Sequence, residues 1–211
     1  MARRKQLKSL SGLFLICTLA ALLLRLWVIE SYRVVSESMA PTLLTGDLIM
    51  VSKPNFSLRF PFSTYEIMKF RGPIRGELVA FSLPEHPIET FVKRVIAIEG
   101  DRVSIENGTL RLNGQPSDYR VDELQANGYE ETVGENHYKI LQSPEMVKDY
   151  GPIDIPKNHF FVLGDNRNDS VDSRTWGPIP RSCLNGKIHL VWFSLKKDTG
   201  VRKERTLLKV N

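Results

Sequence analysis

Two serine hydroxyls stand one residue apart, at Ser36 and Ser38, in the stretch VVSESMAPTLLTGD of residues 34–47. A serine hydroxyl is a weak nucleophile and becomes reactive only when a base lies within hydrogen-bond reach. Histidine is the usual base, but the four histidines of the chain are scattered, and none stands in an HExxH or CxxC setting. The histidines therefore indicate neither a base for the serines nor a metal site.

A lysine in the apolar segment ETFVKRVIAI of residues 89–98 offers a different base. In a strand, alternation places Lys93 on the same face as Phe91, Val95 and Ala97. An amine buried on such a face loses hydration of its charged form, so its pKa falls and it can accept a proton near neutral pH. A strand lysine also commonly keeps its amine at the surface, so position alone leaves both interpretations open.

A third polar stretch, GDNRNDSVDSRTWGP, follows an apolar segment at residues 164–178. Its composition fits a solvated loop. It also fits a support for a catalytic base, in which Ser170 orients an amine and the charged side chains form buried ion pairs. Those charged side chains are Asp165, Arg167, Asp172 and Arg174.

The elements that must position these groups begin with a hydrophobic run. Residues 10–29 read LSGLFLICTLAALLLRLWVI, with Arg25 as the one charge. About 20 apolar residues cross a bilayer as a helix, and Arg25 lies near one end, where it can snorkel. Four basic residues within 1–9 orient the N-terminus toward the cytoplasm. A cleavable signal peptide is the alternative, but the end of the run offers no small-x-small cleavage site.

The rest of the chain predicts a mainly β fold. Short runs rich in β-branched and aromatic residues are bounded by Gly, Pro and Asp, and Asn107-Gly108 lies at the centre of a hairpin pattern. We expect an N-terminal transmembrane helix followed by an antiparallel β-sheet catalytic domain with an inserted β-ribbon subdomain. The expected segments are 1–9 (cytoplasmic), 10–29 (anchor), 30–102 with 159–195 (catalytic core), 103–158 (insertion) and 196–211 (basic tail).

The charge distribution excludes one class of partner. The net charge of +5 is concentrated at the ends: residues 1–9 carry +4 and residues 196–211 carry +4, so the middle carries −3. A nucleic-acid-binding body would be basic. The pattern favours a solvated C-terminal tail, although an anionic membrane surface would also attract it. The two cysteines, Cys17 and Cys183, indicate free thiols rather than a disulfide framework.

Four boxes in this order closely resemble those of the bacterial type I signal peptidases. They are SESMAPTLLTGD (36–47), GELVAFSLPEH (76–86), FVKRVIAIEGD (91–101) and VLGDNRNDSVDSRTWGPIP (162–180). The resemblance implies a membrane-bound serine endopeptidase that removes signal peptides after Ala-x-Ala sites. It also implies an enzyme without cofactor, metal or nucleic acid. Its partners would be preprotein signal peptides and the lipid bilayer, at the extracytoplasmic side of the bacterial inner membrane.

The same resemblance implies residue roles. Ser38 would be the nucleophile and Lys93 the general base, while the Ser36 hydroxyl and the Ser38 N–H would form the oxyanion hole. Ser170, Asp172 and Arg174 would support the lysine. The pocket for a small substrate side chain would be lined by Val34, Met39, Leu43, Phe91 and Val92.

Two positions depart from the usual family pattern. Asn168-Asp169 stands where the family often has Asp-Asn, which puts local loop bonding in question. Glu37 replaces a common glycine beside the nucleophile and adds a negative charge there.

Two other functions remain as alternatives. A different Ser/Lys peptidase, such as the self-cleaving repressors of the SOS response, would carry a DNA-binding domain where this chain has its hydrophobic run. A membrane-tethered β-domain that binds partners without catalysis would leave the polar stretch 164–178 unexplained.

Overall fold

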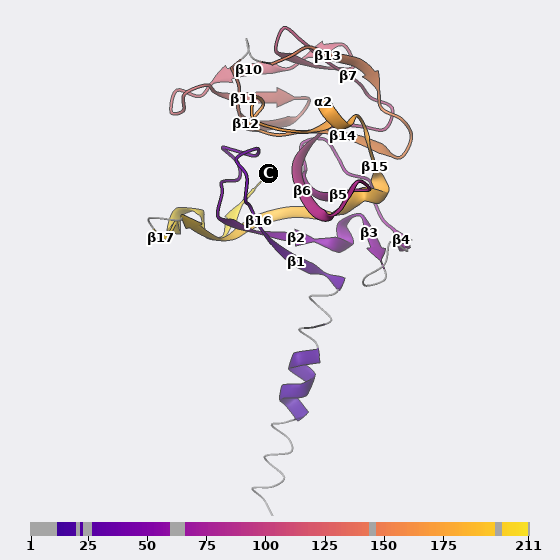
Figure 1. Cartoon of the computed structure of the whole chain (residues 1–211), viewed down its shortest axis with the longest axis vertical. Coiled ribbons are helices and arrows are strands. Elements are labelled where there is room, and N and C mark those ends of the chain that lie inside the picture. The colour runs from indigo at the N-terminus through magenta and orange to yellow at the C-terminus, as the bar shows by residue number, and fades with distance from the viewer. Residues whose placement is uncertain are drawn as a thin grey trace, which may run out of the picture.

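Strands dominate the computed structural model, which describes residues 12–19, 22, 27–59, 66–143, 147–196 and 200–210. The mainly β, antiparallel fold expected from the sequence is confirmed (Figure 1). In chain order the strands are β1 Ile29–Arg33, β2 Asp47–Ser52, β3 Ser57–Arg59, β4 Glu66–Lys69, β5 Leu78–Leu83, β6 His86–Ile98, β7 Arg102–Glu106, β8 Thr109–Leu112, β9 Gln115–Pro116, β10 Asp118–Val121, β11 Gly128–Val133, β12 Asn136–Leu141, β13 Tyr150–Asp154, β14 His159–Leu163, β15 Ile179–Pro180, β16 Leu184–Lys196, β17 Gly200–Val201 and β18 Leu208–Lys209.

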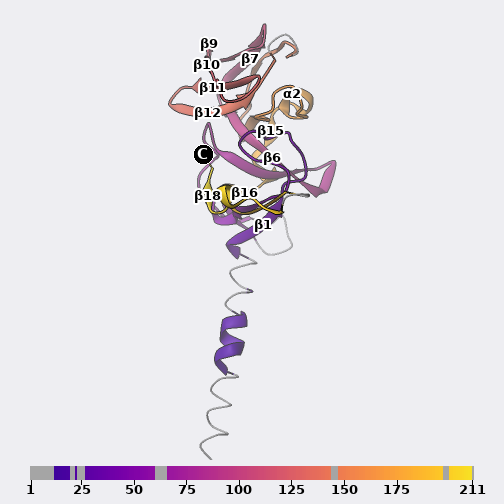
Figure 2. The ribbon, with the colours of Figure 1, turned by 90° about the vertical axis from the view of Figure 1, so that its left-hand side faces the viewer.

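Helical structure is sparse in the body. Among the described residues, the strands are connected by one short helix, α2 Ser173–Trp176, and by the 3-10 turns η1 Lys53–Asn55, η3 Arg181–Cys183 and η4 Lys203–Arg205. Residues 12–19 are helical and lie apart from the sheets in two perpendicular views (Figures 1 and 2). Within the described residues, no helix has both the length and the apolarity to cross a bilayer. Residues 10–11, 20–21 and 23–26 of the anchor expected at 10–29 lie outside the described residues.

The largest sheet carries the three segments that the sequence singled out. Its strand order is β1-β2-β16-β5-β6-β14-β15, with β17 and β18 paired to β16. Residues 34–46 connect β1 to β2, Lys93 lies in β6, and residues 164–178 connect β14 to β15. Because β6 and β14 are neighbours, the sheet brings the lysine strand beside the start of the polar loop.

Strict alternation along β6 is wrong beyond Val95. Phe161 pairs with Ala97, but the next residue of β14 pairs with Val95, so Ile96 is an extra residue in the ladder. Such a β-bulge turns the following side chains to the other face. Val95 therefore packs in one apolar cluster with Phe91, as expected, whereas Ile96 and Ala97 both pack in another.

The region between β6 and β14 forms two further sheets at the end of the molecule opposite the N-terminal helix (Figure 1). One has the order β13-β7-β8-β9 and the other β10-β11-β12. Asn107 and Gly108 have φ angles of 51° and 73°, the left-handed values that a two-residue hairpin turn requires, so the predicted hairpin is confirmed. The domain boundaries drawn from the sequence stay a prediction.

Residues 200–210 of the C-terminal tail lie against the largest sheet, although most of these residues are exposed to solvent. Strands β17 and β18 pair with β16, and the side chains of Arg202 and Arg205 are only 15% and 13% exposed. Both arginines contact the carboxylate of Asp47, which is 0% exposed. A buried carboxylate requires cationic or hydrogen-bonding partners, and the tail provides them.

Candidate active site

Ser38 lies on a tight turn whose apolar neighbours fix it to the core. The Ala40 N–H donates to the Glu37 carbonyl at 2.9 Å, and the Leu43 N–H donates to the Met39 carbonyl at 2.8 Å. Met39 and Leu43 are buried in one apolar cluster, while Ser38 stays partly exposed. The burial of these two side chains therefore presents the Ser38 hydroxyl at the surface.

Lys93 reaches this hydroxyl from β6. Its Nζ lies 2.6 Å from Ser38 Oγ, although the residues are 55 positions apart in the chain. The lysine is 4% exposed. Burial lowers the pKa of Lys93 from 10.5 to about 8, because the charged form loses its hydration. A substantial fraction of the amine is therefore neutral in mildly alkaline solution.

The charges that act on the lysine come from the loop at 164–178. Asp172, Asp165 and Asp169 raise the pKa of Lys93 toward its ordinary value, and Arg174 lowers it, with burial the dominant cause. Three contacts fix the position of the Asp172 side chain. It caps the N-terminus of α2, accepts a hydrogen bond from the Gly164 N–H at 3.0 Å, and forms an ion pair with Arg174 at 2.8 Å. The loop thus holds fixed charges around the amine.

The ion pairs of this loop differ from those expected. Asp172 and Arg174 do pair with each other. Asp165 instead pairs with Arg94 of β6, and Arg167 pairs with Glu131 of β11. Sequence spacing within the loop favoured internal pairs, but the sheet brings partners from other strands closer.

Ser170 lies close to the Ser38 turn without a hydrogen bond to Lys93 in the described chain. Its Oγ is buried and has no partner there. Gly164 separates it from the turn: a Cβ on Gly164 would lie 2.2 Å from Ser170 Oγ and 2.5 Å from the Ser38 carbonyl oxygen. Only glycine fits between these two serines.

The other expected residues group as follows. The Ser36 hydroxyl lies 3.2 Å from Ser38 Oγ. Four of the five expected pocket residues share one apolar cluster: Val34, Met39, Leu43 and Val92. Phe91 lies in a neighbouring cluster, where its ring centroid is 5.0 Å from that of Trp176. Alternation explains the division, because Phe91 and Val92 point to opposite faces of β6.

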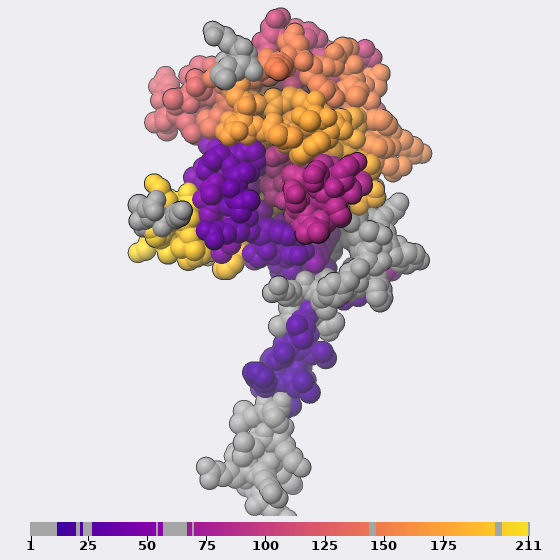
Figure 3. Space-filling view, viewed as in Figure 1, coloured from indigo at the N-terminus to yellow at the C-terminus, as the bar shows by residue number. Residues whose placement is uncertain are grey.

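Figure 3 shows the surfaces of these segments meeting on one face of the molecule. The purple surface of the Ser38 segment, the magenta surface of the β5–β6 hairpin and the light orange surface that follows β14 lie side by side. This is the arrangement that a chain of hydrogen bonds between the three segments requires.

Sequence reasoning missed a polar network beneath the serine. Arg94, next to Lys93, is 1% exposed and binds both carboxylate oxygens of Asp165 at 2.8 and 2.7 Å. Asp165 also accepts from the Thr42 hydroxyl at 2.5 Å. The network joins the lysine strand, the polar loop and the turn that carries Ser38. Its signal in the sequence was an arginine within an apolar strand.

Sequence reasoning also missed Asp47 and Arg205. Arg205 Nη2 donates to the Asp47 carboxylate at 2.5 Å and to the Thr42 carbonyl at 2.9 Å. Asp47 accepts further bonds from the Leu44 N–H at 2.9 Å and the Ser194 hydroxyl at 2.6 Å. Burial alone raises the pKa of Asp47, but these donors together hold it below its usual value. The C-terminal segment therefore stabilises the end of the turn that carries Ser38.

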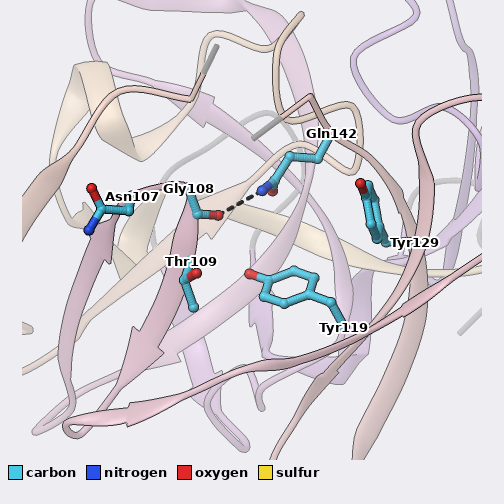
Figure 4. Close-up of a pocket in the computed structure, with 6 residues that line it drawn as sticks. All are labelled: Asn107, Gly108, Thr109, Tyr119, Tyr129 and Gln142. Carbon is cyan, nitrogen blue, oxygen red and sulfur yellow. Dashed lines mark hydrogen bonds between the residues drawn. The ribbon is translucent and has the colours of Figure 1, made fainter. Parts of the chain in front are cut away.

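A cavity of about 160 Å³ lies elsewhere, within the region between β7 and β12. It is lined by the 107–109 turn, Gln142 and two tyrosines, Tyr119 and Tyr129 (Figure 4). Gln142 donates to the Gly108 carbonyl at 2.6 Å across one side of the cavity. None of the residues named above for catalysis lines it. Among the described residues, no group of three or more His, Cys, Asp or Glu side chains could hold a metal ion.

Comparison with known proteins places the chain in a family. The model of a family described as signal peptidase, peptidase S26, matches residues 7–193. The chain belongs to this family. Its relatives include a signal peptidase I from Aquifex aeolicus, 30% identical and covering 90% of this chain and 85% of that protein. One from Buchnera aphidicola is 28% identical over 94% of this chain and 80% of its own length.

This family member is therefore a hydrolase of the signal peptidase I type, a serine peptidase that removes signal peptides from preproteins. A solved structure of a signal peptidase I from Enterococcus faecalis aligns at 23% identity over 56% of this chain and 98% of that one. The TM-score of this alignment is 0.37.

Proposed function

We propose that this signal peptidase cleaves its substrate with Ser38 as nucleophile and Lys93 as general base. The observation that carries the proposal is the 2.6 Å separation between Lys93 Nζ and Ser38 Oγ in a largely buried setting. A serine needs a base within hydrogen-bond distance, and a base needs a pKa near the working pH. The lysine meets both requirements because burial lowers its pKa to about 8.

In the first step, neutral Lys93 accepts the Ser38 hydroxyl proton as Oγ attacks the carbonyl carbon before the scissile bond. The carbonyl oxygen becomes an oxyanion, stabilised by the Ser38 N–H and the Ser36 hydroxyl. The intermediate collapses as the C–N bond breaks, and protonated Lys93 gives its proton to the leaving amine. Water, deprotonated by the same lysine, then hydrolyses the ester and restores the Ser38 hydroxyl.

The supporting groups act through the lysine and the turn. The Asp172–Arg174 pair fixes the loop next to the amine, and the Ser170 hydroxyl on the same loop has no hydrogen-bond partner among the described residues. A rotation of Ser170 toward Lys93 would orient the amine when substrate binds. No metal or cofactor enters this reaction scheme.

The substrate side chain before the cleaved bond enters a shallow apolar surface. Val34 and Val92 are partly buried against the cluster that holds Met39 and Leu43, whereas Phe91 lies on the opposite face of β6, in the neighbouring apolar cluster. Apolar groups of this kind favour a small aliphatic side chain, as in an Ala-x-Ala site. We infer that the substrate adds as an extended strand along the sheet.

The site of action is a membrane surface. Residues 10–29 are apolar enough to span a bilayer once, and the preceding basic residues favour a cytoplasmic N-terminus. The catalytic domain would then face the extracytoplasmic side of the bacterial cytoplasmic membrane, where exported signal peptides remain embedded. Membrane fractionation with protease accessibility of the C-terminal domain tests this topology.

The first experiment incubates detergent-solubilised full-length protein with a preprotein that bears an Ala-x-Ala site. Wild type is compared with Ser38→Ala, and the new N-terminus of any product is sequenced. Cleavage after the last alanine, lost in the variant, is the expected result. Cleavage that survives in Ser38→Ala would remove Ser38 as the nucleophile.

A further inference from the structure

A buried ion pair joins the region between β6 and β14 to the loop beside Lys93. Glu131 of β11 is 0% exposed, and Arg167 of the loop is 3% exposed. The guanidinium binds both carboxylate oxygens, with Arg167 Nη1 at 2.7 Å from Oε1 and Nη2 bonded to Oε2. Burial alone raises the pKa of Glu131, but Arg167 and the Tyr138 hydroxyl hold it below its usual value, so the carboxylate is ionised.

Backbone hydrogen bonds continue this contact at the end of β12. The Leu141 N–H donates to the Asp165 carbonyl at 2.9 Å, and the Arg167 N–H donates to the Leu141 carbonyl at 2.9 Å. Leu141 and Asn166 form a parallel bridge. The beginning of the loop is therefore held as an added strand against β12.

Asn168 makes a third contact with the segment after β12. Its carboxamide oxygen accepts from the Ser143 N–H at 2.6 Å, and its Nδ2 donates to the Ser143 carbonyl at 3.3 Å. An ionised aspartate could accept from the N–H but could not donate to the carbonyl, whereas a carboxamide does both. The asparagine at this position, where the family often has aspartate, thus has a local physical reason.

The same loop also forms hydrogen bonds with the segment that carries the reacting serine. The Asn166 N–H donates to the Ser38 carbonyl at 3.1 Å, and Asn166 Nδ2 donates to the Glu37 carbonyl at 3.3 Å. A second route runs through Arg94, whose guanidinium lies 4.2 Å from the centroid of the Tyr138 ring and pairs with Asp165. Both routes lead from β11–β12 to residues adjacent to the Ser38–Lys93 pair.

We propose that the β11–β12 ribbon is a positioning element of the active site, with Glu131, acting through Arg167, as its central positioning residue. This inference rests on the proposed Ser38–Lys93 mechanism. The ribbon touches neither reacting group; it holds the loop that binds the Ser38 carbonyl. Since a misplacement of about 1 Å at a reacting centre can cost about 100-fold in rate, the fixed position of this loop matters for turnover.

The test uses full-length protein in detergent and a peptide substrate with a small-x-small site, and measures kcat and KM separately. The double variant Glu131→Gln/Arg167→Gln removes both charges, so no unpaired charge is left buried, and the two carboxamides can bond to each other. We expect kcat to fall about tenfold or more while KM changes little. A folded double variant with wild-type kcat would overturn the proposal.

A pH profile separates positioning from general loss of stability. The charged groups that act on Lys93 are those of the loop: Asp172, Asp165, Arg174 and Asp169. If the loop shifts, these charges move relative to the amine, and the midpoint of the profile of kcat/KM moves with them. If the variant only had a lower fraction of folded enzyme, the pH profile of kcat/KM would have a smaller amplitude and an unchanged midpoint. That result would also contradict the positioning role.

Two further variants complete the design. Asn168→Ala changes an exposed side chain, so this variant is expected to fold with little change in thermal stability. Because it removes both hydrogen bonds to Ser143, we expect it to lower kcat. The matched control is Lys139→Met, which removes the ion pair between this exposed lysine of β12 and Asp122 and is expected to leave kcat unchanged. Equal kcat in wild type, Asn168→Ala and the control would contradict the proposal even if the double variant did not fold.

The Ser38→Ala variant distinguishes the two levels of inference. Activity that persists in Ser38→Ala removes the proposed mechanism itself. Loss of activity in Ser38→Ala, together with normal kcat and an unchanged pH midpoint in the ribbon variants, removes only the positioning role.

Discussion

Lys93 Nζ and Ser38 Oγ lie 2.6 Å apart, at the meeting point of a strand in the middle of the largest sheet and a turn near its edge. The charged ammonium donates to the hydroxyl, whereas the neutral amine accepts the hydroxyl proton, so the protonation state of Lys93 decides whether the pair can react.

The first prediction concerns pH. Since only neutral Lys93 serves as a base and its pKa is about 8, kcat/KM is expected to rise with pH and level off above a midpoint near 8.

Lys93→Met is expected to lower the rate by about 100-fold or more, the contribution of a general base, without unfolding the protein. The measurement is a pH–rate profile together with a thermal unfolding scan. A flat profile between pH 6 and about 10 would exclude this lysine as the base.

The second prediction uses the opposite effects of two neighbouring charges on the pKa of Lys93. Asp172 raises this pKa and Arg174 lowers it. Asp172→Asn is therefore expected to move the midpoint of the kcat/KM profile to lower pH, and Arg174→Met to higher pH. Profiles of both variants beside wild type check the signs. Shifts of the same sign in both variants would contradict the electrostatic role assigned to this pair.

The third prediction concerns the oxyanion. Ser36→Ala removes one hydroxyl that lies 3.2 Å from Ser38 Oγ. We expect kcat to fall by about 100- to 1,000-fold, the usual effect of losing one oxyanion donor, while residual cleavage persists through the Ser38 N–H. Since Ser36 is exposed, thermal stability should not change. An unaltered kcat would remove Ser36 from the oxyanion hole.

The fourth prediction tests the close packing at Gly164. An added Cβ would lie 2.2 Å from Ser170 Oγ and 2.5 Å from the Ser38 carbonyl oxygen, both far inside van der Waals contact. Gly164→Ala is therefore expected to displace the turn that carries Ser38 and to abolish most of the activity. Gly72→Ala is the matched control, because a Cβ there meets no atom within 4 Å. Similar rates for the two variants would show that the turn tolerates displacement.

The fifth prediction concerns stability. Arg205→Met leaves the buried Asp47 carboxylate without its main partner and is expected to cost about 3 kcal/mol or more. In wild type the pKa of Asp47 lies below its unfolded value, so this contribution is present at neutral pH and is lost as the pH falls through the folded pKa. In the variant the pKa of Asp47 is higher than in wild type.

The difference in melting temperature between wild type and Arg205→Met is therefore expected to be larger at pH 7 than near pH 4. The control is Arg102→Met, which removes an exposed ion pair with Asp154. This variant should have nearly the wild-type melting temperature at both pH values. A difference that does not depend on pH would exclude Asp47 as the group that responds to Arg205.

Local patterns in the sequence determined much of this protein. Runs of β-branched residues between turn residues predicted the strands, and Asn107-Gly108 predicted its hairpin, because turn geometry depends on adjacent residues alone. The serine turn, the lysine strand and the polar loop were each recognised as candidate chemistry from residue type and spacing. Their assigned roles required the family resemblance, because a lone lysine in a strand carries no unique meaning.

Only the tertiary structure decided which of these groups meet. The pairing of β6 with β14 and the bulge at Ile96 set the faces on which side chains lie, and neither can be read from alternation. Asp165, Arg167 and Asp47 found their partners 71, 36 and 158 positions away, in Arg94, Glu131 and Arg205. A buried charge pairs with whichever opposite charge the packed core brings near it, and that choice depends on strand order rather than on sequence distance.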